Sequence, residues 1–521
     1  MEAIQVPIPF LRMQFHLLGG GRRFGAIGFG YLGLLVVASI ALRRMMMNFP
    51  TAAVIDYLIQ ALGVAQCALL YAGGCNAIHR ATLRDFQTRM NESHRLTPLS
   101  SAGVVLGYLL GSTLQIQLLF GIGLVYGALL SFLGTAQLGG WMFGSVLQLA
   151  GAAMLWSLMV LIGVGTNRPL NPGGILVVLS MLAVPMMFGL PGGAIFSGVY
   201  SATLGFMAAT GVSRVPAAGI LFSVMGSLTL ASFWIYVAAA RYRRPDLPAF
   251  NAYRGMILLA LWLLISFGSV AAYQYTTLTS MTSFGDEESL PVQWTITLIV
   301  SLIVAAIPMS GAVLSRRLVA RGIAPRDWTD RIGDDTVALL TFILVASLSV
   351  LGAVFVVVAL QWTPQLGSAA IPFRQWRPWL WTLAEIAVAL LTVWTVVVIA
   401  VSRCRRPIVA IGTFLLFAWG FPPVIDLILA GTIRVSPRDD FVFSALLVCS
   451  PGGAIAVIWS GNDAPIATGF VVQLVLALVM SLAAFRARRS WSGVNKSNCK
   501  VRECPSLDGQ TTDAVGRPES P

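Results

Sequence analysis

Apolar stretches of about 20 residues recur along this chain from Phe24 to Phe485, separated by short polar segments. A stretch of that length crosses roughly 30 Å of hydrocarbon as a helix, which satisfies its own backbone hydrogen bonds where water is absent. With 57% hydrophobic and 11% charged residues, the chain has too little polar surface to cover a water-soluble globule. The sequence therefore predicts an all-α, polytopic integral membrane protein.

Twelve of these stretches are predicted to span the membrane. They are residues 24–42, 52–75, 104–132, 138–164, 174–190, 217–240, 254–275, 294–314, 336–360, 378–401, 407–430 and 466–485. Two further apolar pieces, residues 193–210 and 441–460, are long enough to be counted as well. The distribution of arginine decides between these counts, because loops rich in Lys and Arg stay in the cytoplasm.

The arginine clusters favour twelve spans. Four arginines within residues 80–95 place the loop after the second span, and with it the N-terminus, in the cytoplasm. If either doubtful piece crossed fully, the arginines of residues 241–244 or 486–489 would lie outside. We therefore predict that both pieces turn back at the outer surface, and that both termini are cytoplasmic in a cell membrane. The clusters between spans also explain the net charge of +13 without any nucleic-acid partner.

A Pro-Gly-Gly sequence lies at residues 191–193 and again at 451–453, half of the chain apart. Pro removes a backbone donor and Gly costs about 1 kcal/mol inside a helix. We therefore expect re-entrant breaks at Pro191, Gly192, Gly193, Pro451, Gly452 and Gly453. The recurrence predicts two six-helix halves, each with a re-entrant external segment; chance recurrence among 51 glycines is the alternative. The predicted domains are an interfacial helix over residues 1–23, the two halves over 24–245 and 246–489, and a disordered cytoplasmic tail over 490–521.

The loop between the second and third spans contains the most distinctive polar stretch, NESHRLTPLS, at residues 91–100. Leu83, Phe86 and Met90 share one face of a helix before it, which predicts an amphipathic helix at the membrane surface. Thr97 and Pro98 are predicted as the N-cap and first residue of the next helix. This geometry suits a lever that a cytoplasmic partner pushes, although such elbows also end ordinary loops at membranes.

Residues 90–112 resemble the first cytoplasmic loop of ABC-2 type transporter permeases. Glu92, the sequence from Thr97 to Ser100, and Gly107 match that pattern, whereas Tyr108 stands where a Lys is usual. The resemblance is specific over about 25 residues and compatible over residues 1–245; residues 316–335, the corresponding loop of the second half, share only placement and charge.

The resemblance implies that this loop acts as a coupling helix docked on a separate ABC ATP-binding protein. It also implies a re-entrant external hairpin between the fifth and sixth spans, where residues 190–216 lie. The residues that would couple to the ATPase partner are Glu92, Arg95, Thr97, Pro98, Leu99 and Ser100.

No phosphate-binding loop of the form G-x-x-x-x-G-K-[ST] occurs in this chain, whose only lysines are Lys496 and Lys500. ATP would therefore be bound by the partner subunit, and we expect no cofactor in this chain. Three histidines and six cysteines show no metal-ligand spacing, so neither a metal site nor an enzyme is expected.

Among the acidic residues within predicted spans, Glu385 lies deepest and is the candidate for an intramembrane polar site. The alternative is a structural role as the partner of Arg377 or of a hydroxyl group. Sparse charge in the spans favours amphipathic or lipid-linked cargo, carried between the two halves or between two chains of a homodimer.

The sequence thus predicts the permease subunit of an ATP-driven ABC-2 type exporter. The alternative from a different class is a multi-span carrier or membrane scaffold without an ATPase, in which Glu385 would be essential.

Overall fold

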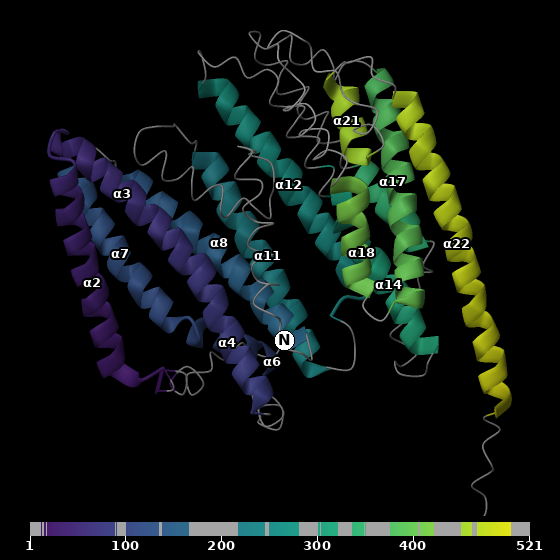
Figure 1. Cartoon of the computed structure of the whole chain (residues 1–521), viewed down its shortest axis with the longest axis horizontal. Coiled ribbons are helices and arrows are strands. Elements are labelled where there is room, and N and C mark those ends of the chain that lie inside the picture. Colours follow the sequence, from purple (N-terminus) through teal and green to yellow (C-terminus); the bar gives the residue numbers. More distant parts are fainter. Residues whose placement is uncertain are drawn as a thin grey trace, which may run out of the picture.

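The computed structural model is built from helices, which lie side by side (Figure 1). No strand occurs among the residues that the structure describes. Those residues are 12, 15–16, 18–88, 90, 100–134, 138–165, 217–244, 249–280, 298, 301–302, 304–320, 336–347, 350, 376–404, 407–420, 450–460 and 466–501.

Seven helices or continuous helical runs in this part are long and apolar enough to cross a membrane. They are α2 (Gly20–Met45), the run Thr51–Asp85, α7 (Leu114–Leu133), α8 (Leu138–Gly165), α11 (Ala217–Arg243), α17 (Trp376–Arg403) and α22 (Ile466–Val501). Shorter or less uniformly apolar helices are α6 (Ser101–Gly111), α12 (Ala252–Ser280), α14 (Ala306–Ala320), α18 (Pro407–Leu415) with the π-helix η4 (Leu416–Gly420), and α21 (Pro451–Ser460). The prediction of an all-helical membrane fold is confirmed at this level. The count of twelve stays a prediction, because the predicted span 174–190 lies outside the described residues.

Two of the predicted spans are jointed rather than straight. The run Thr51–Asp85 consists of α3 (Thr51–Ala68), the π-helix η1 (Leu69–Gly73) and the start of α4 (Gly74–Gln87). The predicted third span, residues 104–132, is divided between α6 and α7 by a turn at Ser112 and Thr113. Both interruptions separate the outer part of a span from the part that leads to the predicted coupling loop.

Each half of the chain has its own hydrophobic core. The first core draws mainly on α4, α6, α8 and α11, and the second on α14, α17, α18 and α21. Helix α12 lies between them, because its Leu258 belongs to the first core while Leu259 and Trp262 belong to the second. A Cβ atom on Gly255 would lie 2.4 Å from the Cα atom of Pro308, so only glycine lets α12 and α14 approach this closely. The two halves pack directly against each other through α11 and α12.

The ends of the described chain differ from expectation. Near the N-terminus, Gly19 and Gly20 have φ angles of 103° and 62°, a left-handed conformation that glycine adopts without steric cost. At the other end, α22 continues to Val501, so the predicted tail boundary at residue 490 falls inside a helix.

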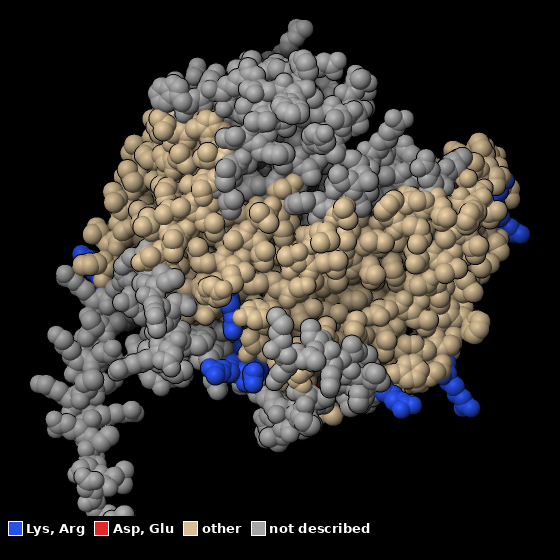
Figure 2. All heavy atoms as spheres, turned by 180° about the vertical axis from the view of Figure 1, so that it is seen from behind, with Lys and Arg blue, Asp and Glu red and all other residues tan. Residues whose placement is uncertain are grey.

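Basic side chains gather mainly along one edge of the helix layer, and the broad middle of the face in Figure 2 is uncharged. The last turns of α4, α11, α14 and α17 each contain arginine. Helix α2 also ends in Arg43 and Arg44, and which edge of the helix layer faces the cytoplasm stays a prediction.

Candidate functional site

The predicted coupling loop meets the described structure at Ser100. Its backbone is extended, with φ −66° and ψ 142°, and its hydroxyl accepts a 3.1 Å hydrogen bond from the Gly103 amide. Ser100 is therefore the N-cap of α6, three residues later than the predicted cap at Thr97. The predicted coupling residues Glu92, Arg95, Thr97, Pro98 and Leu99 lie outside the described residues.

Helix α4 buries a different face from the one that the sequence predicted. It continues α3 through η1, and its buried face is formed by Ile78, Ala81 and Asp85. Leu83, from the predicted apolar face, is only half-buried, and Met90 is exposed. The predicted face was wrong at Met90 because α8 packs against α4 on another side. The location of this helix at the membrane surface stays a prediction.

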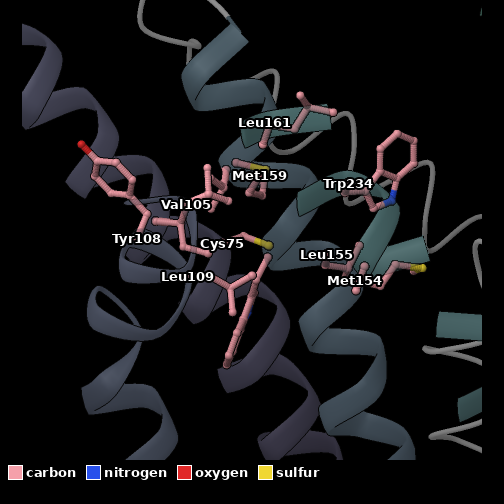
Figure 3. Close-up of a cluster of buried hydrophobic side chains, with 14 of the residues drawn as sticks. Cys75, Val105, Tyr108, Leu109, Met154, Leu155, Met159, Leu161 and Trp234 are labelled. Atoms are coloured by element: carbon pink, nitrogen blue, oxygen red, sulfur yellow. The ribbon is translucent and has the colours of Figure 1, made fainter. Parts of the chain in front are cut away.

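The buried faces of α4, α6, α8 and α11 meet in one cluster (Figure 3). Cys75 of α4 and Leu109 of α6 lie in it together with Met159 of α8 and Trp234 of α11. The side chains at this level are apolar and buried. A polar contact within this cluster is therefore stronger than one at the surface.

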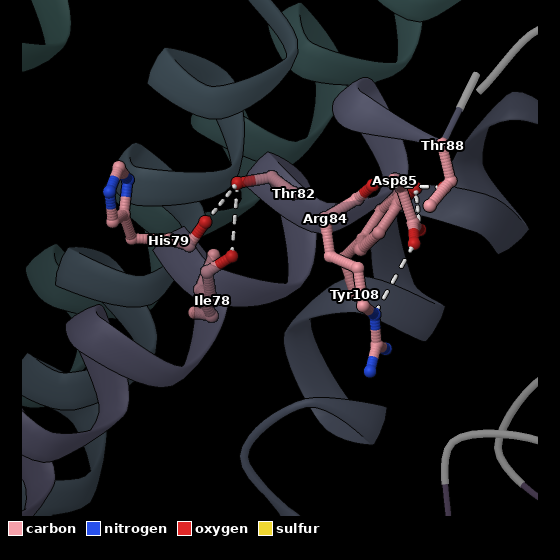
Figure 4. Close-up of polar contacts among 7 residues, drawn as sticks. All are labelled: Ile78, His79, Thr82, Arg84, Asp85, Thr88 and Tyr108. Carbon is pink, nitrogen blue, oxygen red and sulfur yellow. Dashed lines mark hydrogen bonds and ion pairs between the residues drawn. The ribbon is translucent and has the colours of Figure 1, made fainter. Parts of the chain in front are cut away.

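Such a contact joins Asp85 to Tyr108 (Figure 4). The Tyr108 hydroxyl donates a 2.6 Å hydrogen bond to Asp85 Oδ2, and the two residues are 1% and 2% exposed. Arg84 Nε lies 4.0 Å from Asp85 Oδ1 at the edge of the cluster. The bond pins α4 to α6, the two helices on either side of the predicted coupling loop.

Sequence reasoning treated Tyr108 as a lost positive charge and did not find its partner. A usable signal was present, because Ile78, Ala81 and Asp85 recur at helical spacing and place an acid on an apolar face. A Lys at position 108 would bury a second charge beside Asp85. The Tyr108 hydroxyl instead donates a hydrogen bond to this carboxylate while remaining neutral.

The upper end of α4 is a joint at η1. π-helical turns leave the regular i to i−4 ladder and occur frequently at functional sites. The Trp156 indole N–H donates a 2.9 Å hydrogen bond to the Leu70 carbonyl within η1. A Cβ atom on Gly74 would lie 2.1 Å from Trp156 Nε1, so glycine at this position is what admits the indole.

The upper end of α6 is a second joint, at Ser112 and Thr113. Each hydroxyl donates a 2.6 Å hydrogen bond to the carbonyl four residues earlier, which satisfies the end of α6 without continuing the helix. A Cβ atom on Gly73 would lie 3.2 Å from the Ile116 side chain, so the second joint adjoins η1. We call α4 and α6 the jointed pair. The Asp85–Tyr108 hydrogen bond links the two helices, and each adjoins a joint, η1 for α4 and Ser112–Thr113 for α6.

The Pro-Gly-Gly sequence at 451–453 starts a helix. Ser450 caps α21 by accepting a 3.1 Å hydrogen bond from the Gly453 amide, and Pro451 is the first helical residue. With ten residues, α21 is about 15 Å long, half of what a membrane crossing needs. The related residues Pro191, Gly192 and Gly193 lie outside the described residues, so the predicted pair of re-entrant segments stays a prediction.

Glu385, the predicted intramembrane polar site, is fully buried on α17. Gln473 of α22 lies beside it. Neither carboxylate oxygen has a hydrogen-bond partner of normal geometry among the described residues. The side chain of Arg377, its predicted alternative partner, is not described.

Within the described residues, no group of three His, Cys, Asp or Glu could hold a metal ion. Comparisons with protein-family models, curated proteins and solved structures find no match for this chain. The functional conclusion therefore depends on the geometry above and on the motif in the predicted coupling loop.

Proposed function

We propose that this chain is the membrane permease subunit of an ATP-driven exporter of the ABC-2 type. The resemblance of residues 90–112 supports the proposal, and the observation that carries it is the jointed pair. Two short helices flank the predicted coupling loop, are pinned by a buried hydrogen bond, and are each separated by a joint from the rest of their span.

The jointed pair would transmit force in a simple way. A partner ATPase that closes on ATP pushes residues 91–99, and α4 and α6 move together because Asp85 and Tyr108 hold them. The joints at η1 and at Ser112 and Thr113 take up the change in angle, so the outer helices α3 and α7 need not bend. Movement in the cytoplasm thereby becomes tilting within the membrane.

The remaining parts of the proposal follow from the sequence. The chain lies in the cell membrane with both termini in the cytoplasm and contains neither a catalytic site nor a cofactor of its own. Its ABC ATP-binding protein supplies ATP hydrolysis. Amphipathic or lipid-linked cargo passes between the two halves, or between two copies in a homodimer.

The test removes the bond that pins the pair. In the complex with the ATP-binding protein, Tyr108→Phe should lower transport about tenfold while ATP hydrolysis continues, because α4 and α6 no longer move together. A tenfold change corresponds to a loss of about 1.4 kcal/mol of coupling free energy. Tyr126→Phe is the matched control: it removes a similar 2.7 Å hydrogen bond, to Ser39 of α2, outside the pair. Equal transport by both variants would contradict the role of the jointed pair.

Two substitutions in the loop address the ATPase contact itself. Glu92→Ala and Pro98→Gly should uncouple ATP hydrolysis from transport while leaving the protein inserted in the membrane. Unaffected transport in both variants would count against the exporter assignment.

The alternative is an ATPase-independent carrier or membrane scaffold, and the burial of Glu385 favours it. A carrier predicts that the purified chain transports cargo in vesicles without any partner, and that Glu385→Gln abolishes this transport. Co-purification with an ATP-binding protein, together with transport that stops when ATP is withheld, would exclude it.

A further inference from the structure

Glu385 lies within a group of helices from the second half of the chain. Its helix α17 packs against α22, α14, α21 and α18. Thr382 precedes it by one helical turn on the same face of α17 and is also buried. The Thr382 hydroxyl has no hydrogen-bond partner among the described residues, and the Glu385 carboxylate has only Gln473 beside it, without a hydrogen bond of normal geometry.

Basic residues on these helices lie far from the level of Glu385. Helices α21 and α18 contain none, and α14 has basic residues only near its end, among them Arg317, which binds the Val401 carbonyl close to the end of α17. On α17 itself, Arg377 and Arg403 are about 12 Å and 27 Å along the axis from Glu385. On α22, the first basic residue follows Gln473 by about 20 Å of helix.

The neighbours of Glu385 are therefore polar but uncharged. Gln473 and Thr382 offer oxygen atoms, and neither can neutralise a carboxylate. An ionised carboxyl group without a counter-charge is costly in such surroundings, and an ionisable residue inside a membrane helix marks a functional site by default. No basic side chain that the structure describes on these helices lies at the level of Glu385, so a positive charge brought by a bound molecule can complete the site.

Helix α22 covers Glu385 on the side where its own outer face is apolar and exposed. Gln473 faces inward and is 4% exposed, whereas Val472 and Val475 on the other side are half exposed. Glu385 is thus one helix away from a surface suited to lipid. A molecule with an apolar body in the bilayer and a charged end can therefore approach it.

We propose that Glu385 binds the ammonium group of an amphipathic cationic cargo. The carboxylate supplies the counter-charge, and the oxygens of Gln473 and Thr382 accept the remaining N–H groups of a primary ammonium. This inference rests on the proposed function, because it names the class of cargo that the permease carries. The binding step needs no covalent change, only the opening of α22 relative to α17.

Direct binding to the purified full-length chain in lipid nanodiscs tests the site without the ATPase. The probes are a dansyl-labelled alkylamine and its N-acetylated derivative, in which one acetyl group removes the charge of the nitrogen. The amine should bind with a fluorescence change, and Glu385→Gln should weaken its binding about tenfold or more. Binding of the acetylated derivative should be the same in both proteins.

A second variant guards against a change in folding. Gln473→Lys places an ammonium group beside Glu385 from within the protein, so it should block the amine although the carboxylate is present. Unchanged amine affinity in Glu385→Gln would overturn the proposal. An equal loss of amine and acetylated probe would overturn it too, because the site would then not recognise charge.

The same experiment separates this inference from the exporter assignment. If the amine fails to bind while the Tyr108 and Glu92 variants still uncouple ATP hydrolysis, only the cargo class is wrong. If the amine binds but no ATP-binding protein is needed for transport, the site stands and the exporter assignment fails.

Discussion

The two halves of the molecule each bury an acid, and they treat it in opposite ways. Asp85 accepts a 2.6 Å hydrogen bond from Tyr108 and has Arg84 at 4.0 Å. Glu385 is equally buried, yet its carboxylate has no hydrogen-bond partner of normal geometry among the described residues. The fold supplies Asp85 with a hydrogen-bond donor and a nearby positive charge, and it supplies Glu385 with neither among the described side chains, apart from the neighbouring Gln473.

The two acids differ in whether partners within the chain satisfy them, and this bears on their proposed roles. A buried polar group whose partners come from the same chain fixes the relative position of two elements. A buried charge without such partners is costly to maintain, and its retention points to something that binds there. This difference supports our proposal that the first half transmits force and the second binds cargo.

The largest effect is expected from replacing each acid by an apolar side chain. Asp85→Leu should cost about 3 kcal/mol of unfolding free energy, because the buried Tyr108 hydroxyl loses a charged acceptor. Glu385→Met should instead leave stability unchanged or raise it by up to about 1 kcal/mol, since an unfavourable buried carboxyl group is removed. Denaturant unfolding in mixed micelles measures both, and losses of equal size would remove the distinction.

A smaller effect should follow from opening the first joint. Trp156→Phe removes the donor to the Leu70 carbonyl and should cost about 1 to 2 kcal/mol. Trp141→Phe is the control, because its indole donates a comparable 3.0 Å bond to Leu124, away from the joints. We expect similar losses of thermal stability but impaired transport only for Trp156→Phe; impairment by both would show that the joint has no special role.

The smallest effects are expected at the two serine caps, which have matching geometry in the two halves. Ser100→Ala should cost about 1 kcal/mol, and Ser450→Ala slightly more, because Ser450 is fully buried and its hydroxyl has no access to water. Comparing the unfolding midpoints of the two variants checks this order. A larger loss of stability for Ser100→Ala would mean that the N-cap of α6 also stabilises the predicted coupling loop.

Most of the fold could be predicted from the apolar stretches, because a helix of about 20 residues is the simplest structure that satisfies the backbone in hydrocarbon. The helices α2, α8, α11 and α17 lie where the sequence placed spans. The joints could not be predicted, since η1 and the turn at Ser112 and Thr113 interrupt stretches that remain apolar. They depend on partners far along the chain, among them Trp156 for η1.

The candidate site was predicted only in part. The coupling loop stays a prediction from its motif, and Glu385 is buried in a helix, as expected of an acid inside a span. The Asp85–Tyr108 bond was missed, because its two residues are 23 positions apart and belong to different helices. The apolar face expected on α4 was wrong for the same reason, since the neighbouring α8 decides which face is buried.

By itself the sequence determined that the chain is a helical membrane protein, because hydrocarbon accepts only segments that satisfy their own backbone. It also determined where charge could lie along the chain, since arginine is excluded from most of each span. Only the tertiary structure decided which polar side chains inside the membrane have partners. That decision requires contacts between helices, and spacing along one helix does not contain them.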